Sequence, residues 1–180
     1  VTIYNTDGSG VLLDSTVYRN VITTSDPTAK PTTDLTNKDK YLKKSFTDYV
    51  GTVKGEEKSD YTINYKADGS SVDTTTYYYY YAGVYKAGDT IPAGSAIGDA
   101  RPAERVSDAA GHVNADSYMT RSETLRGDST KKQITYYSGT ESGEEVTSWS
   151  KEYNYNGSSV KTVTIYNTDG SGVLLDSTVY

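Results

Sequence analysis

The same eighteen residues, VTIYNTDGSGVLLDSTVY, stand at both ends of the chain, at positions 1–18 and 163–180. Because position 163 repeats position 1, the period of the repeat is 162 residues. Units that recur at a fixed spacing usually stack and bury their faces against one another. We therefore expect this chain to be a section of a longer, tandemly repeated protein, in which residues 1–18 and 163–180 are equivalent.

A second, more diverged repeat lies inside this period. Residues 49–78 align with residues 137–166 without a gap, at a shift of 88 positions, and fourteen of the thirty pairs are identical. The identical pairs include Gly-Glu-Glu and Gly-Ser-Ser-Val, and Tyr61 stands opposite Trp149. Each 162-residue unit is therefore interpreted as two related halves of unequal length.

The composition and the local patterns predict an all-β protein. The chain has 19 Tyr, and Tyr and Thr favour the pleated, half-buried surface of a sheet. Residues 145–155 place Thr147, Trp149, Lys151, Tyr153 and Tyr155 on one face by alternation, as 61–65 do with Tyr61, Ile63 and Tyr65. Turn sequences follow at 67–70, 156–158 and 169–172, where Asp-Gly and Asn-Gly favour hairpins. We expect a tandem β-hairpin or β-sheet module, solenoid-like or sandwich-like, with a thin core of aromatic rings.

Two segments interrupt this pattern. All four prolines lie in residues 23–40 and 82–116, which lack periodicity and are interpreted as loop insertions on the β scaffold. Residues 37–48 are the best candidate for a helix, of one or two turns. The predicted division is the repeat end 1–18, a first half 19–81 with loop 23–40, an irregular insertion 82–129, and a second half 130–180.

A tyrosine-to-glycine spacing recurs through the chain. It runs Tyr65, Gly69, Val72, Tyr77, then Tyr153, Gly157, Val160, Tyr166, and again Tyr166, Gly170, Val173, Tyr180. The spacing resembles the tyrosine-rich YD (RHS-type) hairpin repeats of large bacterial surface and toxin proteins, and more loosely MORN-like hairpin arrays. The resemblance implies a β-hairpin array on an exported bacterial protein, at the cell surface or outside the cell, and it carries over no catalytic residue.

Several classes of chemistry lack the residues they need. Cysteine is absent, and His112 is the one histidine, in a polar loop where it is interpreted as solvated. The Glu56-Glu57 and Glu144-Glu145 pairs follow glycines and are interpreted as solvated turns rather than glycosidase acids. A net charge of −6 argues against nucleic acid, and no apolar run approaches the ~20 residues of a membrane span. We therefore expect no enzyme, no nucleic-acid partner and no membrane insertion.

The loop Asn5–Gly10, repeated at 167–172, spaces oxygen atoms somewhat as a calcium loop does. Asn5, Asp7, Asn167 and Asp169 are its calcium candidates, but the closing bidentate Glu of such loops is missing. A plain hairpin turn is the alternative that we prefer, without cofactor. Asn156-Gly157-Ser158 fits an N-glycosylation acceptor and equally a hairpin turn.

Five consecutive tyrosines, Tyr77, Tyr78, Tyr79, Tyr80 and Tyr81, make both faces of one strand aromatic. They either pack against the sheet and a neighbouring unit, or form a stacking platform for sugars. With Tyr61, Tyr65, Trp149, Tyr153 and Tyr155 they are the predicted packing residues. The favoured function is a structural unit of an extracellular fibre or giant surface protein that associates with copies of itself. The alternative is an adhesin-type repeat that binds carbohydrate or another cell surface, with 82–116 as the presenting loop.

Overall fold

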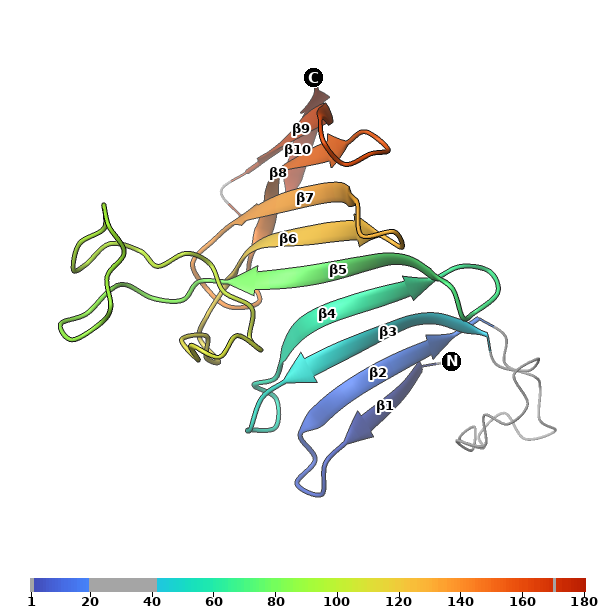
Figure 1. The fold of residues 1–180 in the computed structure, drawn as a ribbon, viewed down its shortest axis with the longest axis horizontal. Coiled ribbons are helices and arrows are strands. Elements are labelled where there is room, and N and C mark those ends of the chain that lie inside the picture. Colours follow the sequence, from blue (N-terminus) through green and yellow to red (C-terminus); the bar gives the residue numbers. More distant parts are fainter. Residues whose placement is uncertain (1, 20–41, 170) are drawn as a thin grey trace.

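The described residues, 2–19, 42–169 and 171–180 of a computed structural model, form ten strands in one open sheet (Figure 1). Every neighbouring pair is antiparallel, and the spatial order of the strands is their order in the sequence. The all-β prediction is thus confirmed. The strands are β1 Thr2–Thr6, β2 Leu12–Tyr18, β3 Lys43–Val50, β4 Lys58–Tyr65, β5 Val72–Tyr80, β6 Met119–Arg126, β7 Lys131–Ser138, β8 Val146–Tyr153, β9 Val160–Thr168 and β10 Leu174–Val179.

Two segments of the described chain lie outside the regular sheet. Residues 81–118 connect β5 to β6 and project beside the sheet as a lobe that contains no strand (Figure 1). One isolated bridge, Val84 with Ala100, lies within the lobe, and another joins Glu104 to Tyr80 of β5. The predicted insertion 82–129 is therefore irregular only as far as residue 118, because Met119–Arg126 pair with β5 and β7. The predicted loop 23–40 lies outside the described residues.

The predicted helix at 37–48 is wrong for the residues that the structure describes. Lys43–Val50 form β3, which pairs with β2 on one side and β4 on the other. Phe46 lies in this strand and is opposite Thr16 of β2 and Ile63 of β4. Backbone hydrogen bonds to β2 and β4 on its two edges hold this segment in a strand, and they outweigh the local helical preference of its sequence. No helix long and apolar enough to cross a bilayer occurs in the described part of the chain.

The strands repeat at the shift of 88 residues seen in the sequence. Adding 88 to the bounds of β3, β4 and β5 gives the bounds of β7, β8 and β9. The register shifts coincide as well, since those after Asp48 and Asn64 recur after Tyr136 and Glu152. The predicted turns at 67–70 and 156–158 connect β4 to β5 and β8 to β9, and Gly69 and Gly157 both have positive φ angles there. The two halves therefore share strand lengths, register and turn positions.

The two faces of the sheet carry different side chains. On one face, aromatic rings lie next to each other across strands, with centroids 6.1 Å apart for Phe46 and Tyr61 and 6.3 Å apart for Tyr61 and Tyr77. On the other face a polar row crosses the sheet, in which the hydroxyl groups of Thr47 and Thr62 lie 2.9 Å apart. The row is completed by register partners, namely Ser15, Thr76, Thr124, Gln133, Glu152 and Thr162.

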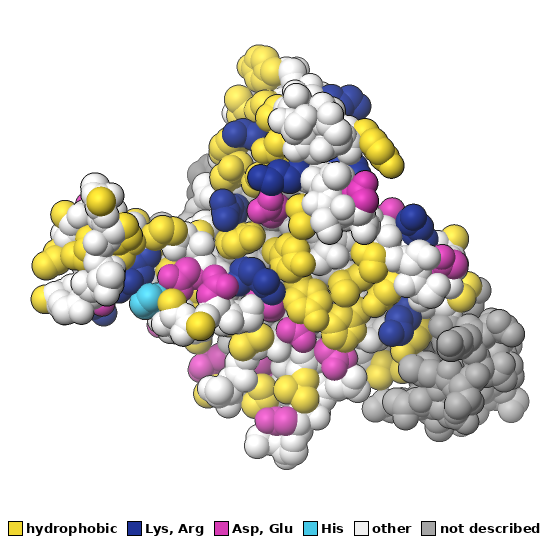
Figure 2. All heavy atoms as spheres, in the orientation of Figure 1, with side chains coloured by type: hydrophobic (Ala, Val, Ile, Leu, Met, Phe, Trp, Pro, Cys, Tyr) yellow, Lys and Arg dark blue, Asp and Glu magenta, His cyan; other side chains and the backbone are white. Residues whose placement is uncertain are grey.

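The core is thin, as the aromatic composition predicts. Among the residues that the structure describes, only a few apolar side chains are buried, and they are outnumbered by buried polar ones such as Ser122 and Ser150. The hydroxyl of Tyr49 lies 3.4 Å from Ser15 Oγ, and that of Tyr137 lies 3.2 Å from Ser122 Oγ. In Figure 2, hydrophobic side chains gather over the middle of the viewed face, with charged groups among and around them. Small hydroxyl-bearing residues under tyrosine rings are thus a major part of the buried interior.

Candidate functional site

The lobe of residues 81–118 is fastened to the sheet by an ion pair with a carboxylate that is almost completely buried. Tyr49 pairs with Ser59 and Asp48 with Tyr61, so Asp60 is the extra residue of a β-bulge. Asp60 is 2 % exposed and forms an ion pair with Arg105. Arg105 Nε and Ser107 Oγ, both in the lobe, also donate to Asp60 Oδ1, at 3.1 and 2.9 Å. The bulge therefore aims a carboxylate at the lobe.

Arginine side chains also cover two of the five consecutive tyrosines. The guanidinium of Arg105 lies 4.5 Å from the ring centroid of Tyr77, and that of Arg121 lies 4.2 Å from the centroid of Tyr79. Such cation–π contacts are favourable when the cation is partly desolvated. These two tyrosines are half-buried and do not form a free aromatic surface.

The other tyrosines of the run are packed as well. Tyr80 is 7 % exposed, and its hydroxyl donates to the carbonyl of Ser59 at 2.8 Å. Burial is the main cause that raises the pKa of the Tyr80 phenol far above its ordinary value. The Tyr78 hydroxyl lies 3.1 Å from Thr62 Oγ1, and the Tyr81 ring stacks on Tyr118 with centroids 4.9 Å apart. All five members of the predicted cluster thus have a partner within the chain.

The remaining predicted packing residues are distributed over the sheet. Trp149 stacks on Tyr136, with ring centroids 4.1 Å apart and an angle of 7° between the planes. Tyr61 packs between two other rings, and Tyr65 lies under Lys43. Tyr153 is half-buried, whereas Tyr155 is 80 % exposed. The ten residues therefore do not converge on one site.

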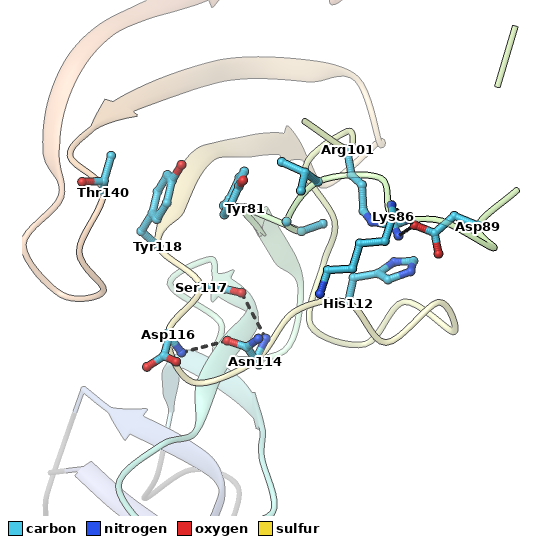
Figure 3. Close-up of a pocket in the computed structure, with 13 residues that line it drawn as sticks. Tyr81, Lys86, Asp89, Arg101, His112, Asn114, Asp116, Ser117, Tyr118 and Thr140 are labelled. Atoms are coloured by element: carbon cyan, nitrogen blue, oxygen red, sulfur yellow. Dashed lines mark hydrogen bonds and ion pairs between the residues drawn. The ribbon is translucent and has the colours of Figure 1, made fainter. Parts of the chain in front are cut away.

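A cleft of about 500 Å³ lies within the lobe, where Thr140 of the β7–β8 connection also borders it (Figure 3). Tyr81 and Tyr118 stand along one side of it, and Lys86, His112 and Asn114 lie across from them or below. His112 Nδ1 lies 2.9 Å from a carboxylate oxygen of Glu104, so the histidine predicted to be solvated has a partner in the lobe. An aromatic wall with amide, hydroxyl and charged groups has the chemistry of a polar ligand site.

The second glutamate of each Gly-Glu-Glu motif fastens a turn to a neighbouring strand. Glu57 Oε1 accepts the backbone N–H of Leu12 at 2.7 Å, and Glu57 Oε2 accepts that of Gly55 at 2.8 Å. Glu145 accepts the N–H groups of Met119 and Gly143 in the same way, at 2.6 and 2.9 Å. These two glutamates, expected in solvated turns, therefore join each turn to the strand beyond its own hairpin.

The identical hairpins at the two ends of the chain have opposite surroundings. In hairpin 1–18, β2 pairs with β3, and no described strand pairs with the outer edge of β1. In hairpin 163–180, β9 pairs with β8, and no described strand pairs with the outer edge of β10. Val11 is 3 % exposed, whereas its equivalent Val173 is 59 % exposed. Tyr18 and Tyr180 are 7 % and 72 % exposed. Strand β10 therefore presents an apolar, unpaired edge.

The calcium candidates are used by the hairpin turns themselves. Asp7 Oδ1 accepts the N–H groups of Ser9 and Val11, and Asp169 Oδ1 accepts the equivalent pair. Hydrogen bonds from the backbone, led by that of Val173, lower the pKa of Asp169 below its usual range. Asn5 and Asn167 each donate to an aspartate of the same hairpin, at 2.7 and 2.6 Å. These contacts are those of a hairpin turn, the preferred prediction, and calcium binding stays the untested alternative.

The glycosylation candidate has the same explanation. Asn156 Oδ1 accepts the backbone N–H of Ser158 at 3.0 Å and its hydroxyl at 2.6 Å. Among the described residues, no group of three or more His, Asp or Glu side chains is arranged to hold a metal ion.

Comparisons of the chain with family models, with curated proteins and with solved structures gave no match.

Proposed function

We propose that this chain is a non-catalytic structural unit of an extracellular fibre or of a giant bacterial surface protein, built by continuation of one β-sheet from unit to unit. The observation that carries the proposal is the pair of identical hairpins with complementary open edges. Hairpin 1–18 is paired through β2, whose equivalent β10 has no described partner on that side. Hairpin 163–180 is paired through β9, whose equivalent β1 has no described partner on that side. A hairpin with both neighbours in place would have β8 of one unit on one side and β3 of the next on the other.

The shared geometry of the two halves supports a tandem β-hairpin module. Each half meets the strand before it, β2 or β6, in the same way. A buried serine of that strand lies under a tyrosine of the half, and a glutamate of the half accepts the backbone N–H of the strand's first residue. Each 162-residue period comprises eight strands, β2 to β9, before β10 repeats β2. Further units can join such a sheet only at its two edge strands. The array therefore lengthens along one axis, as a solenoid does.

Chains of one, two and four units, joined so that consecutive units share one hairpin, test this proposal. At a strand spacing of about 4.8 Å, eight strands lengthen the sheet by roughly 38 Å for each added unit. Negative-stain electron microscopy or small-angle X-ray scattering measures this increment. Particles that gain volume without lengthening would contradict continuation of the sheet.

An adhesin-type repeat is the second candidate, and the cleft beside Tyr81 and Tyr118 is the observation that favours it. Aromatic faces next to amide and charged groups suit carbohydrate rings. A glycan array probed with the chain tests this candidate, with Tyr118→Ala to remove the wall and Tyr155→Ala as an exposed tyrosine elsewhere. Glycan binding that Tyr118→Ala abolishes and Tyr155→Ala preserves would support it; no binding, or equal binding by both variants, would reject it.

A further inference from the structure

Taking the adhesin-type candidate above as the basis, we infer that the cleft of the lobe binds a carboxylated sugar. The acid group of this sugar lies on the ammonium group of Lys86, and its ring lies against the wall of Tyr81 and Tyr118. Three properties of the cleft point to such a ligand (Figure 3). They are a fixed aromatic wall, one lysine without a carboxylate partner, and hydrogen-bonding groups that the lobe itself does not use.

The two rings of the aromatic wall hold each other in place. Tyr81 and Tyr118 are the first and last residues of the lobe, and their rings stack with centroids 4.9 Å apart and 12° between the planes. The backbone N–H of Tyr81 also donates to the carbonyl of Tyr118 at 2.9 Å. A ligand that stacks on this wall does not have to order it, which lowers the entropic cost of binding.

Three basic side chains of the described residues line the cleft, and two of them have carboxylate partners in the lobe. Arg101 forms an ion pair with Asp89, and His112 Nδ1 lies 2.9 Å from a carboxylate oxygen of Glu104. The third is Lys86, which is exposed and forms no ion pair with any carboxylate among the described residues. Lys86 is therefore the side chain that can receive an anionic group of a ligand.

Asn114 and Asp116 supply hydrogen-bonding groups for sugar hydroxyls. Asn114 Oδ1 accepts the backbone N–H of Asp116 at 2.9 Å, and the backbone N–H of Asn114 donates to Ser117 Oγ at 3.1 Å. These bonds orient the amide of Asn114, whose Nδ2 group has no partner among the described residues. Asp116 is exposed beside it. The cleft thus offers both a donor and an acceptor to hydroxyl groups.

The charges of the cleft favour a ligand residue with one acid group. A dense polyanion such as nucleic acid needs several cations, and the carboxylate of Asp116 and the net charge of −6 would repel it. A neutral sugar would leave the ammonium group of Lys86 without a partner. A sugar residue with one carboxylate, a uronic or sialic acid, uses the wall, the hydroxyl-binding groups and the cation together. The volume of about 500 Å³ is in the range of small-ligand sites.

Matched ligands test the requirement for the carboxylate. Trigalacturonic acid and its methyl ester have the same rings and differ in charge, and sialyllactose and lactose form the second pair. We expect the acid member of one pair to bind at least about tenfold more tightly than its neutral partner, because hydrogen bonds to charged groups are the stronger ones. Isothermal titration calorimetry measures the affinities, and the pair that responds distinguishes a uronic from a sialic acid.

Variants of Lys86 test which side chain receives the acid. Lys86→Gln should weaken binding of the acid ligand about tenfold or more and leave the neutral ligand unaffected, whereas Lys86→Arg should retain binding. Lys66→Gln is the matched control, because Lys66 is an exposed lysine of the β4–β5 turn. Tyr118→Phe keeps the ring and should bind, and Tyr118→Ala should not; circular dichroism and hydrogen exchange check that the lobe of each variant stays folded.

Equal affinity for the acid and neutral members of both pairs would overturn this inference and leave the adhesin-type candidate standing. Acid binding that Lys86→Gln leaves unchanged would overturn it as well. If none of the four ligands binds, the inference fails, and the glycan array then decides the adhesin-type candidate by itself. The lengthening of multi-unit chains tests the structural proposal independently of all these outcomes.

Discussion

Glu57 reaches across the edge of its own hairpin to accept the backbone N–H of Leu12, 45 residues earlier in the chain, at 2.7 Å. Glu145 makes the equivalent bond to Met119, 26 residues earlier, at 2.6 Å. The sequence separations differ because different loop lengths lie between the strands, yet the contact is the same. A carboxylate thus substitutes for a ladder hydrogen bond at the point where each turn leaves the sheet.

The hydrogen bond from Leu12, with that from Gly55, lowers the pKa of the Glu57 carboxyl. A lowered pKa in the folded state means that the contribution to stability is present above the unfolded pKa of about 4.3 and is lost as the pH falls through the folded value. We expect Glu57→Gln to reduce this loss, so that its stability falls less steeply than that of the wild type below that pH. Urea unfolding at a series of pH values measures the difference.

Glu56→Gln is the control for this prediction, because Glu56 is the exposed neighbour in the same turn. Its acid dependence should follow that of the wild type. If the two variants shift the pH dependence equally, the effect comes from net charge and not from the bond to Leu12.

Breaking the ion pair between Asp60 and Arg105 should cause a large loss of stability, and the lobe should be affected first. Arg105→Met leaves the carboxylate of Asp60, 2 % exposed, without its cation. Removing one partner of a buried pair costs about 3–5 kcal/mol, and the partly exposed arginine side chain places this pair near 3 kcal/mol. Chemical denaturation measures the total, and hydrogen exchange should show the lobe opening first.

The double variant Asp60→Leu with Arg105→Met is the matched test. It removes both charges, and we expect it to be more stable than Arg105→Met alone. A double variant that is less stable than the single one would show that the unpaired carboxylate is not the main cost, and that Asp60 stabilises the protein through its other contacts, such as the hydrogen bond from Ser107.

The fold class and most strand-forming segments could be predicted from the sequence, because alternation and Asp-Gly or Asn-Gly turns are local signals. The extent of β3 and β6 could not be predicted. The Lys-rich start of β3 and the mixed residues of β6 show no clear alternation, and both strands are held by partners on two edges.

Bulges account for other differences from the sequence-based expectations. Alternation places Thr147 on the face of Trp149, but their partners Tyr137 and Tyr136 are adjacent in β7, so Ser148 is an extra residue that interrupts the pattern. Asp60 is the bulge residue of β4 that corresponds to Ser148 in β8. Its ion pair with the lobe could not be predicted from the sequence, because a shift of one residue in register turns a side chain to the other face of the sheet. The recurrence of Gly-Glu-Glu was a usable signal for Glu57 and Glu145, although it did not reveal their backbone partners.

An alanine in place of Gly157 should lower the stability of the protein for two reasons, a steric clash and a positive φ angle, and the two can be measured separately. The φ angle of Gly157 is +73°, and a Cβ there would lie 2.6 Å from the backbone nitrogen of Lys131. Gly55 has a φ angle of +87° with open space around it. We expect Gly55→Ala to cost about 1–2 kcal/mol, the left-handed penalty alone, and Gly157→Ala to cost clearly more. Thermal unfolding of both variants measures the difference, and equal losses would mean that the β6–β7 turn yields without strain.

Trp149 predicts an optical signal for the aromatic face, since it is the one tryptophan of the chain. Its ring stacks on Tyr136 at 4.1 Å between centroids. Tyr136→Leu keeps an apolar side chain but removes the stacking, and we expect a loss of about 1 kcal/mol and a red shift of the tryptophan emission. Tyr155→Leu changes a tyrosine that is 80 % exposed and should leave the emission unchanged. An emission maximum that moves equally in both variants, or in neither, would contradict a stacked indole in the folded sheet.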